Sequence, residues 1–232
     1  MIDLPRGELV VPGGTPGELP SEIRGSAVVL RRPDPVGDTR VLFAATHGST
    51  EREAVWAYMG YGPWADEAAM RSWVESTVPS EDPFWWTVVA YGVPVGMATV
   101  MSRDATHRRA EIGNIWYVPE AHRTTVNTEA AYLMIRECFD TLGCRRVEWK
   151  CDALNDRSRI AALRLGFVFE GVFRDHMIIK GRNRDTAWFA MTVDDWAMAR
   201  PALEKWLYRT PRDVAGRPTS SLTAVTSPES AS

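Results

Sequence analysis

The sequence between residues 111 and 174 carries the strongest structural signal in the chain. It begins with Glu111-Ile-Gly-Asn-Ile-Trp-Tyr-Val-Pro-Glu120 and continues through His122-Arg-Thr-Thr-Val-Asn-Thr-Glu-Ala130. Further on, Asn155-Asp-Arg-Ser158 leads to Leu165-Gly-Phe-Val-Phe-Glu-Gly171. This order predicts a strand, a loop, a helix, a second strand and a second helix start. A loop that enters a helix N-terminus presents free N–H groups to phosphate, so we expect an anion-binding loop here.

Apolar periodicity on both sides of this stretch predicts an α/β (α+β) fold, in which a mixed, mostly antiparallel sheet is flanked by helices. Two early helices, a hairpin around Gly92 and a terminal hairpin around Gly181 surround a central strand-helix-strand crossover. The last helix contains Pro201, where we expect it to break. The predicted strands are 25–32, 84–90, 94–101, 108–118, 145–151, 167–180 and 184–192, and the predicted helices are 36–47, 66–77, 127–142, 156–165 and 194–208.

Length and composition favour one domain. The chain has 232 residues, 45% of them hydrophobic, which is enough for a full core. Residues 1–24 are rich in Pro and Gly, and residues 209–232 are rich in Ser, Thr and Pro. We therefore expect an N-terminal extension over 1–24, a folded domain over 25–208 and a loosely attached, disordered tail over 209–232.

Charge and cysteine content exclude several classes of function. A net charge of -3 gives no basic surface for nucleic acid. No apolar run is long enough for a membrane span, and the N-terminus lacks a signal-peptide pattern, so we expect a soluble cytoplasmic protein. The three cysteines lack metal or redox spacing and should be buried thiols, and the histidines do not form a metal site. Among the ten tryptophans, any that are exposed would favour a homodimer.

The motifs of the central stretch resemble those of the GNAT superfamily of acyl-CoA-dependent N-acetyltransferases, in particular its RimJ/RimL-like branch. That branch has a Pro-Glu pair after the fourth strand, a loop of the form Q/R-x-x-G-x-G/A, and a helix beginning Thr-Glu-Ala. This chain has Pro119-Glu120, then His122, Thr125 and Asn127 at the three loop positions, then Thr128-Glu129-Ala130. It also has Asn155-x-x-Ser158, Leu165-Gly166-Phe167 and Glu170-Gly171. The resemblance covers residues 25–207.

The resemblance implies that acetyl-CoA is the acyl donor and that the loop, two helix starts and the end of a strand bind it. Both loop glycines are replaced, at Thr125 and Asn127, although glycine normally allows close approach or positive φ. An acidic side chain in the first helical turn, Glu129, would oppose a phosphate unless it points away. The expected donor-binding residues are Trp116, Tyr117, Val118, His122, Arg123, Thr124, Thr125, Val126, Asn127, Thr128, Asn155 and Ser158.

Acetyl transfer to an amine requires a base, a polarised thioester carbonyl and a proton for the departing sulfur. The resemblance suggests Glu111 as the base, and backbone N–H groups near Tyr117 and Val118 for the carbonyl. The alternative interpretation, equally supported, is that Glu111 is a strand residue ion-paired with nearby arginines. The family's usual Tyr proton donor is replaced by Ala162, so Ser158 is the candidate donor, with a helix-capping role as its alternative. Tyr132 and Cys151 are weaker candidates.

The resemblance places the amine acceptor between the first two helices and the last hairpin. The aromatic segment 56–64 either lines this acceptor site or packs over the core. Arg174 and His176 either select the acceptor or form a surface ion pair with Asp175, while residues 182–184 are interpreted as a solvated turn. The expected acceptor-binding residues are Tyr58, Tyr61, Trp64, Arg174 and His176.

The sequence therefore predicts an N-acetyltransferase that binds acetyl-CoA and a primary amine, a small molecule or a protein N-terminus, in one ternary complex. A catalytically silent acyl-CoA-binding module is the alternative, because the glycines and the tyrosine are missing. A dinucleotide-binding domain is disfavoured because no G-x-G-x-x-G follows an early strand.

Overall fold

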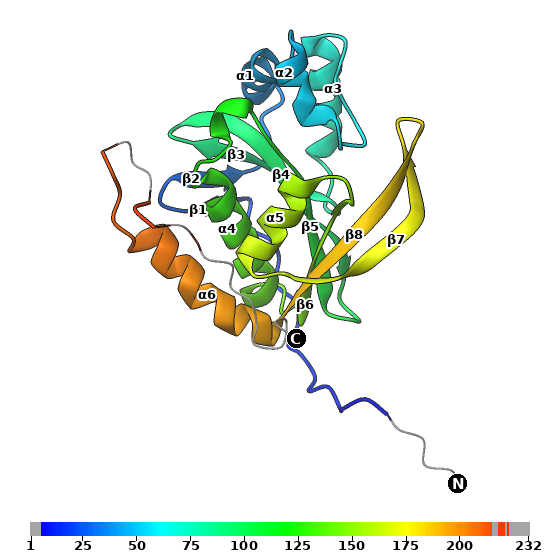
Figure 1. Ribbon diagram of the computed structural model, residues 1–232, viewed down its shortest axis with the longest axis vertical. Coiled ribbons are helices and arrows are strands. Elements are labelled where there is room, and N and C mark those ends of the chain that lie inside the picture. The colour runs from blue at the N-terminus through cyan, green and yellow to red at the C-terminus, as the bar shows by residue number, and fades with distance from the viewer. Residues whose placement is uncertain (1–5, 215–217, 221, 223–232) are drawn as a thin grey trace.

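Eight strands form one sheet in the order β1-β2-β3-β4-β5-β6-β8-β7 (Figure 1). The structure is a computed structural model that describes residues 6–214, 218–220 and 222. Every neighbouring pair of strands is antiparallel except β5 and β6, which are parallel and are connected through α4. The predicted mixed, mostly antiparallel sheet with a central crossover is confirmed. The strands are β1 Glu22–Arg24, β2 Val28–Arg31, β3 Phe84–Ala90, β4 Val93–Asp104, β5 Arg109–Tyr117, β6 Arg146–Asp152, β7 Val168–Ile179 and β8 Arg182–Thr192.

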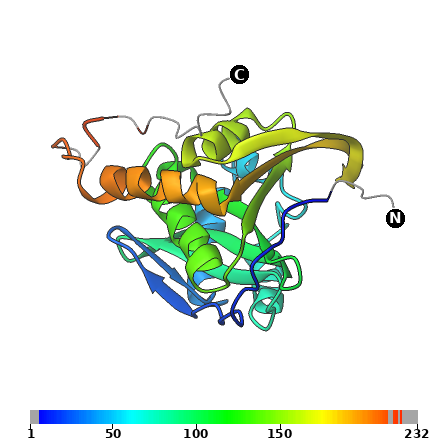
Figure 2. The same cartoon turned by 90° about the horizontal axis from the view of Figure 1, so that it is seen from below.

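The helices cover the two faces of the sheet unequally. α1 packs on α3 and β4, and these early helices gather at one end of the molecule (Figure 1). On the opposite face α4 packs against β2, β5 and β6, and α6 packs against α4 between the two edges of the sheet (Figure 2). The helices are α1 Gly37–Thr46, α2 Thr50–Glu53, α3 Glu67–Thr77, α4 Val126–Asp140, α5 Asp156–Leu165 and α6 Val193–Tyr208, with 3-10 turns η1 Ala54–Trp56 and η2 Pro119–Ala121.

Alternation along the strands separates the two faces. In β3, Trp85 packs against Trp73 of α3, whereas the adjacent Trp86 is fully buried on the other side and donates from Nε1 to the Pro20 carbonyl. Because successive side chains point to opposite faces, the central strands are apolar at consecutive positions and form the core between both helix layers.

The sheet begins earlier than the sequence predicts. Glu22–Arg24 forms the edge strand β1 and pairs with β2, so two strands precede α1, where we expected one. Leu19 is also buried, and Gly17 N donates to the Thr141 carbonyl. The expected boundary at residue 25 therefore cuts through the β1–β2 hairpin. A three-residue edge strand carries too little periodicity to be read from sequence.

The last helix does not break at Pro201. α6 runs through this residue, starting from a capping box in which Thr192 Oγ1 accepts from Asp195 N and Asp195 Oδ2 accepts from Thr192 N. Packing of Trp196, Ala199, Leu203 and Leu207 outweighs the backbone hydrogen bond that Pro201 cannot make.

Only part of the expected C-terminal tail is described. Trp206 Nε1 donates to the Ser220 carbonyl, which ties that segment to α6. Residues 1–5, 215–217, 221 and 223–232 lie outside the described residues. All three cysteines are free and buried, as predicted. No helix in the described part of the chain is long and apolar enough to cross a membrane.

Candidate active site

β5 and β6 separate in the middle of the sheet. Their parallel ladder joins Arg109–Glu111 to Arg146–Glu148 and ends there, while β5 continues to Tyr117 and β6 to Asp152. Past Glu111, the edge of β5 that faces β6 therefore has no strand partner. We call the place where the two strands separate the fork.

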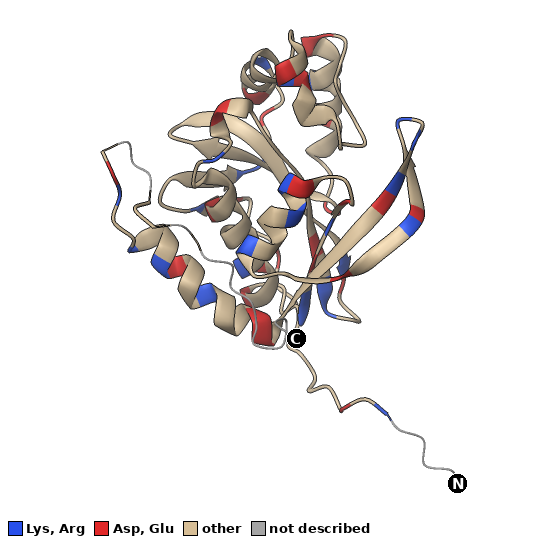
Figure 3. Cartoon of the chain, in the orientation of Figure 1, with Lys and Arg blue, Asp and Glu red and all other residues tan. Residues whose placement is uncertain are grey.

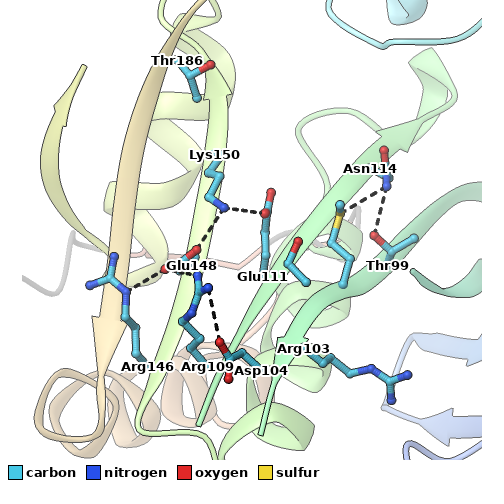
Figure 4. Close-up of polar contacts among 12 residues, drawn as sticks. Thr99, Arg103, Asp104, Arg109, Glu111, Asn114, Arg146, Glu148, Lys150 and Thr186 are labelled. Carbon is cyan, nitrogen blue, oxygen red and sulfur yellow. Dashed lines mark hydrogen bonds and ion pairs between the residues drawn. The ribbon is translucent and has the colours of Figure 1, made fainter. Parts of the chain in front are cut away.

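Glu111 stands at the fork in a buried charge network (Figure 4). Lys150 Nζ lies 2.9 Å from Glu111 Oε2 and 3.0 Å from Glu148 Oε2, so one ammonium bridges a carboxylate from each strand. It also lies 4.0 Å from the centre of the Trp188 ring. Arg146 and Arg109 balance the second carboxylate, Glu148, from its other side.

The environment of Glu111 favours the neutral form more than water does. Burial raises the pKa of Glu111 above its ordinary value, and the charge and hydrogen bond of Lys150 oppose that rise. A carboxyl with a raised pKa is a better proton acceptor near neutral pH. Glu111 therefore has the position and the electrostatics of a general base, and its predicted ion pair proves to be with Lys150 rather than with the neighbouring arginines.

A bulge in β5 prepares a backbone donor beyond the fork. The β4–β5 register slips between Thr99–Gly113 and Met97–Trp116, and Asn114 lies there with φ 51°. Val118 N donates to the Val95 carbonyl at 2.8 Å. Since hydrogen-bonded and non-bonded pairs alternate in antiparallel ladders, the Gly96–Tyr117 pair leaves the Tyr117 N–H directed away from β4. Of the N–H groups near Tyr117 and Val118 that are expected to polarise the carbonyl, that of Val118 is already paired, which leaves the Tyr117 N–H as the candidate.

The loop after β5 does not need glycine to reach its conformation. Thr125 has φ -75° and ψ -11°, and Asn127 lies inside α4, so both lie in the right-handed region open to every residue. The left-handed residue is Arg123, with φ 60°. Thr124 stabilises the turn, because its Oγ1 donates to the Ala121 carbonyl and accepts from Val126 N.

Glu129 points away from the start of α4. Its carboxylate accepts from Ser26 N at 2.6 Å and from Ala27 N at 2.9 Å, both in the β1–β2 turn. A Cβ at Gly25 would lie 2.7 Å from Glu129 Oε1, so a side chain at this position would displace the carboxylate. The acid in the first turn is therefore used to hold the β1–β2 hairpin, and it does not oppose an anion at the helix N-terminus.

Two polar side chains at the start of α4 are buried without partners. Asn127 Oδ1 and Thr128 Oγ1 make no hydrogen bond within the described structure, although such atoms are normally satisfied. His122 and Arg123 flank them, and partial burial of the His122 ring together with the Arg157 charge lowers the pKa of His122. α5 adds basic residues beside this loop (Figure 3). The unpaired Thr128 hydroxyl, a helix N-terminus and positive charge together suit a phosphate-bearing ligand.

The second helix start, at α5, is held by its own side chains. Asn155 Oδ1 accepts from Ser158 N, which confirms the capping geometry expected of an Asn-x-x-Ser start. Ser158 Oγ accepts from Trp149 Nε1 at 2.9 Å. Burial raises the pKa of the Cys151 thiol, and a hydrogen bond with Ser158 opposes that rise. The Ser158 hydroxyl thus already has two neighbours on β6. Tyr132 donates to Glu204 of α6, between two helices.

The aromatic segment after α2 is mostly a packed plug. Trp56 is almost fully buried, and the Trp56 and Trp116 ring centres lie 4.6 Å apart. Tyr61 and Trp64 pack against Trp73 at 4.5 and 4.8 Å, and burial raises the pKa of the Tyr61 hydroxyl well above its usual range. The Trp116 side chain therefore joins the core on the α1–α3 side and is directed away from α4.

Two contacts join this plug to the other half of the sheet. Tyr58 OH donates to the Leu154 carbonyl in the loop after β6, at 3.1 Å. Lys180 Nζ, at the tip of the β7–β8 hairpin, donates to the Trp56 carbonyl at 2.8 Å. Both contacts bridge the early helices to the strands beyond the fork. Tyr58 and Lys180 thus mark one end of the sheet face that carries Glu111.

The two hairpin residues predicted to bind the acceptor face different surroundings. His176 Nδ1 lies 2.9 Å from Thr186 Oγ1, and its ring packs against Phe173 and Trp188, whose partner is Lys150. Arg174 is exposed. Hydrogen bonds from Asp175 N and Asn183 lower the pKa of Asp185, and the positive charge of Arg174 lowers it further.

Sequence reasoning missed Lys150, which holds the centre of the network. Its strand, Arg146-Val-Glu-Trp-Lys-Cys-Asp152, alternates charged and apolar residues. That alternation places Arg146, Glu148 and Lys150 on one face, and the register with β5 then places them beside Glu111. The alternation was visible in the sequence, but the register was not.

Comparison with known proteins identifies the fold and its family. A family model described as "Acetyltransferase (GNAT) domain" matches residues 28–168. The chain belongs to the GNAT acetyltransferase family. Because the family transfers acetyl groups from acetyl-CoA, this GNAT domain is an acyl-CoA-dependent acetyltransferase with acetyl-CoA as its acyl donor, in agreement with the resemblance of the sequence.

Solved structures and a curated relative support the same assignment. A GCN5-related N-acetyltransferase from Brucella melitensis is 35% identical with a TM-score of 0.83, and the match covers 90% of this chain and 96% of that one. A GNAT-family protein from Chromobacterium violaceum is 35% identical with a TM-score of 0.76, covering 84% and 98%. YdaF of Bacillus subtilis (strain 168), named as a candidate ribosomal N-acetyltransferase, is 30% identical over 101 residues, 44% of this chain and 55% of YdaF. The match with YdaF thus spans only about half of that protein.

The residues of this GNAT domain fit the donor that the family uses. The unpartnered Thr128 hydroxyl, the start of α4 and the nearby His122 and Arg123 suit the phosphates of acetyl-CoA. The second helix start offers the Asn155 amide nitrogen on the other side of the fork. The missing glycines leave the backbone unstrained, so their loss does not exclude the donor.

Proposed function

We propose that the protein is an N-acetyltransferase that transfers the acetyl group to a primary amine by direct attack in a ternary complex. The single observation that carries this proposal is Glu111, a buried carboxyl at the fork where β5 and β6 separate, with a raised pKa and a defined cationic partner. Direct attack requires that the amine lose a proton close to the thioester, and a base at the fork meets that requirement.

The other residues then take complementary roles. The start of α4, with His122, Thr125 and Asn127, binds the phosphates, and Asn155 binds the amide-bearing arm of the donor. The Tyr117 N–H stabilises the oxygen of the tetrahedral intermediate, since it points away from β4. Glu111 removes the amine proton directly or through one water molecule. Lys150 keeps Glu111 oriented and limits the rise of its pKa.

Ser158 remains our candidate for delivering a proton to the departing thiolate. Its hydroxyl lies at the first turn of α5 and contacts Trp149 and Cys151 of β6, the strand on the far side of the fork. Trp149 donates to Ser158 Oγ, so the proton that Ser158 would pass on is its own hydroxyl proton, which faces the Cys151 sulfur. A Ser158→Ala variant should lose part of its turnover while it keeps donor affinity. Unchanged turnover would remove Ser158 from the mechanism.

We further propose that the acceptor amine approaches from the sheet face that carries α1–α3. Tyr58, Trp64 and His176 border that face, and Glu111, Lys150 and Trp188 form its floor. The Pro119-Glu120 pair and Thr128-Glu129-Ala130 favour the RimJ/RimL-like branch. The description of YdaF as a ribosomal N-acetyltransferase is compatible with that branch. A protein N-terminus is therefore one acceptor class to include, beside small-molecule amines. The cytoplasmic location and the homodimer stay predictions.

An acceptor screen tests this function. Acetyl-CoA should raise the melting temperature of the protein, because a ligand selective for the folded state stabilises it by mass action. With acetyl-CoA present, thiol release should rise on addition of at least one primary amine among amino acids, small amines and peptide N-termini. A melting shift without thiol release for any amine would instead establish a catalytically silent acyl-CoA-binding module.

A further inference from the structure

The β7–β8 hairpin places a second polar group on the sheet face that carries Glu111. In the β6–β8 ladder Lys150 is opposite Trp188 and Asp152 is opposite Thr186. Because side chains alternate along a strand, Arg184 is the next residue of β8 on that same face. Met177 is opposite Arg184 in the β7–β8 ladder, and His176 precedes it next to Thr186.

Arg184 is a half-buried cation without a carboxylate. Its Nε is buried and lacks a hydrogen-bond partner, and within the described residues no carboxylate lies within ion-pair distance of its guanidinium. The other cations on this face are paired, since Lys150, Arg109 and Arg146 all contact Glu148. The charge of Arg184 nevertheless acts on the proposed base. Burial raises the pKa of Glu111, Lys150 opposes that rise, and the Arg184 charge adds to the opposition.

His176 gives the same place a second donor. Thr186 Oγ1 holds its Nδ1 at 2.9 Å, and contacts with Phe173 and Trp188 fix the ring. The Nε2 atom has no partner among the described residues. A guanidinium and an imidazole nitrogen side by side on a strand pair form a donor set suited to carboxylate or phosphate.

We propose that the acceptor amine carries an anionic group, a carboxylate or a phosphate, which Arg184 binds while the amine lies at Glu111. The ligand would supply the acceptor atoms that the buried Arg184 Nε lacks, and His176 Nε2 would donate beside it. Arg184 is a specificity-determining residue in this assignment, because it contacts the distal end of the acceptor and none of the reacting atoms. The proposal rests on the proposed amine acetyltransferase function and narrows its acceptor class.

Matched acceptor pairs test the proposal in the full-length protein. Thiol release is measured for an amino acid against its amide, and for phosphoethanolamine against ethanolamine, and kcat and KM are determined separately. The wild type should prefer the anionic member of at least one pair by about tenfold or more in kcat/KM, the value of one charged hydrogen bond. A preference for the amino acid over its amide would show that the anionic group of the acceptor is a carboxylate. A preference for phosphoethanolamine over ethanolamine would show that it is a phosphate.

Variants of the hairpin locate the effect. Arg184→Gln should remove the preference, mainly by raising KM for the anionic amine, while kcat/KM for the neutral amine stays within about threefold. Arg184→Lys should keep part of the preference for the anionic amine, because lysine carries the positive charge but lacks the planar guanidinium that can bind two oxygens at once. Arg182→Gln is the matched control. It makes the same chemical change in the same hairpin at an exposed residue of the turn, and it should leave the preference intact.

The outcomes separate this proposal from the function on which it rests. Equal rates for charged and neutral amines in the wild type, or an unchanged preference in Arg184→Gln, would overturn the anion subsite and leave the N-acetyltransferase proposal standing. A protein that binds acetyl-CoA and acetylates no amine of either kind would overturn both.

Discussion

The two faces of the sheet meet at the fork, and they differ in how the sequence specifies them. On the α4–α5 face the binding elements are local: a loop, two helix starts and their capping side chains, each made by residues close in sequence. On the α1–α3 face Glu111, Lys150 and Arg184 come from three different strands and meet only through strand register. The donor side is thus built from backbone geometry, and the acceptor side from long-range pairing.

Removing the proposed base should produce the largest effect of any single change. Glu111→Gln preserves shape and removes the proton acceptor, so kcat/KM should fall by about 100-fold or more. The Kd for acetyl-CoA should hardly change, because the donor phosphates bind on the other face. Steady-state kinetics and calorimetric titration measure the two quantities. Glu170→Gln is the matched control, since Glu170 is exposed on β7 and, among the described residues, pairs only with Arg146. An equal loss in both variants would contradict the assignment.

Lys150→Met should move the pH profile as well as the stability. Glu111 acts as its carboxylate, so activity rises with pH as Glu111 loses its proton. Because Lys150 lowers the pKa of Glu111 against the effect of burial, its removal should shift that rise to higher pH. The buried carboxylates would also lose a partner, at a cost of about 3 kcal/mol in the free energy of unfolding. The pH dependence of kcat/KM and urea denaturation test both effects, and an unshifted acidic limb would break the proposed coupling.

Glu129→Gln tests whether the Glu129 carboxylate, in the first turn of α4, holds the β1–β2 hairpin or faces the bound donor. Its carboxylate accepts two backbone N–H bonds from Ser26 and Ala27, so the variant should lose about 2 kcal/mol of stability. Donor affinity should stay the same. Tighter binding of acetyl-CoA to Glu129→Gln would show that the charge faces the phosphates after all. Thermal unfolding and acetyl-CoA titration decide between the two.

The smallest effect is expected from restoring a glycine. Thr125→Gly should lower stability by roughly 0.5–1 kcal/mol, because glycine gains backbone freedom in the unfolded chain. It should not tighten acetyl-CoA, since Thr125 already has right-handed dihedrals. Thr128→Val is the informative counterpart, because it removes an unpartnered buried hydroxyl that can donate to a phosphate oxygen, and it should weaken acetyl-CoA a few-fold without a loss of stability. A large gain in affinity for Thr125→Gly would show that the side chain obstructs the donor.

Sequence reasoning succeeded where structure depends on neighbours in the chain. The strand Phe84–Ala90 and the helix Asp156–Leu165 have the predicted bounds, and Gly166 ends that helix with φ 98°. Hydrophobic period and capping residues specify such elements directly. The short strand β1 and the helix α2 were missed, because three or four residues carry no readable period.

The site was less predictable for a different physical reason. Glu111 was proposed because its place in the strand matched a family pattern, but Lys150 and Arg184 were not, since a one-residue change of register would turn each to the other face. Arg184 was interpreted as part of a solvated turn, whereas its Nε is buried beside the face of Glu111. Trp116, expected near the donor, instead packs on Trp56. Contacts between distant strands are what a single sequence does not specify.

A crystal structure of the complex with acetyl-CoA would test most directly whether donor and acceptor meet at the fork from opposite faces. The phosphates should lie at the start of α4, the thioester between β5 and β6 near the Tyr117 N–H, and the acetyl carbon should face Glu111, directly or across one water molecule. A thioester bound away from the fork, or a donor lying across Lys150 and Arg184 on the α1–α3 face, would contradict this arrangement.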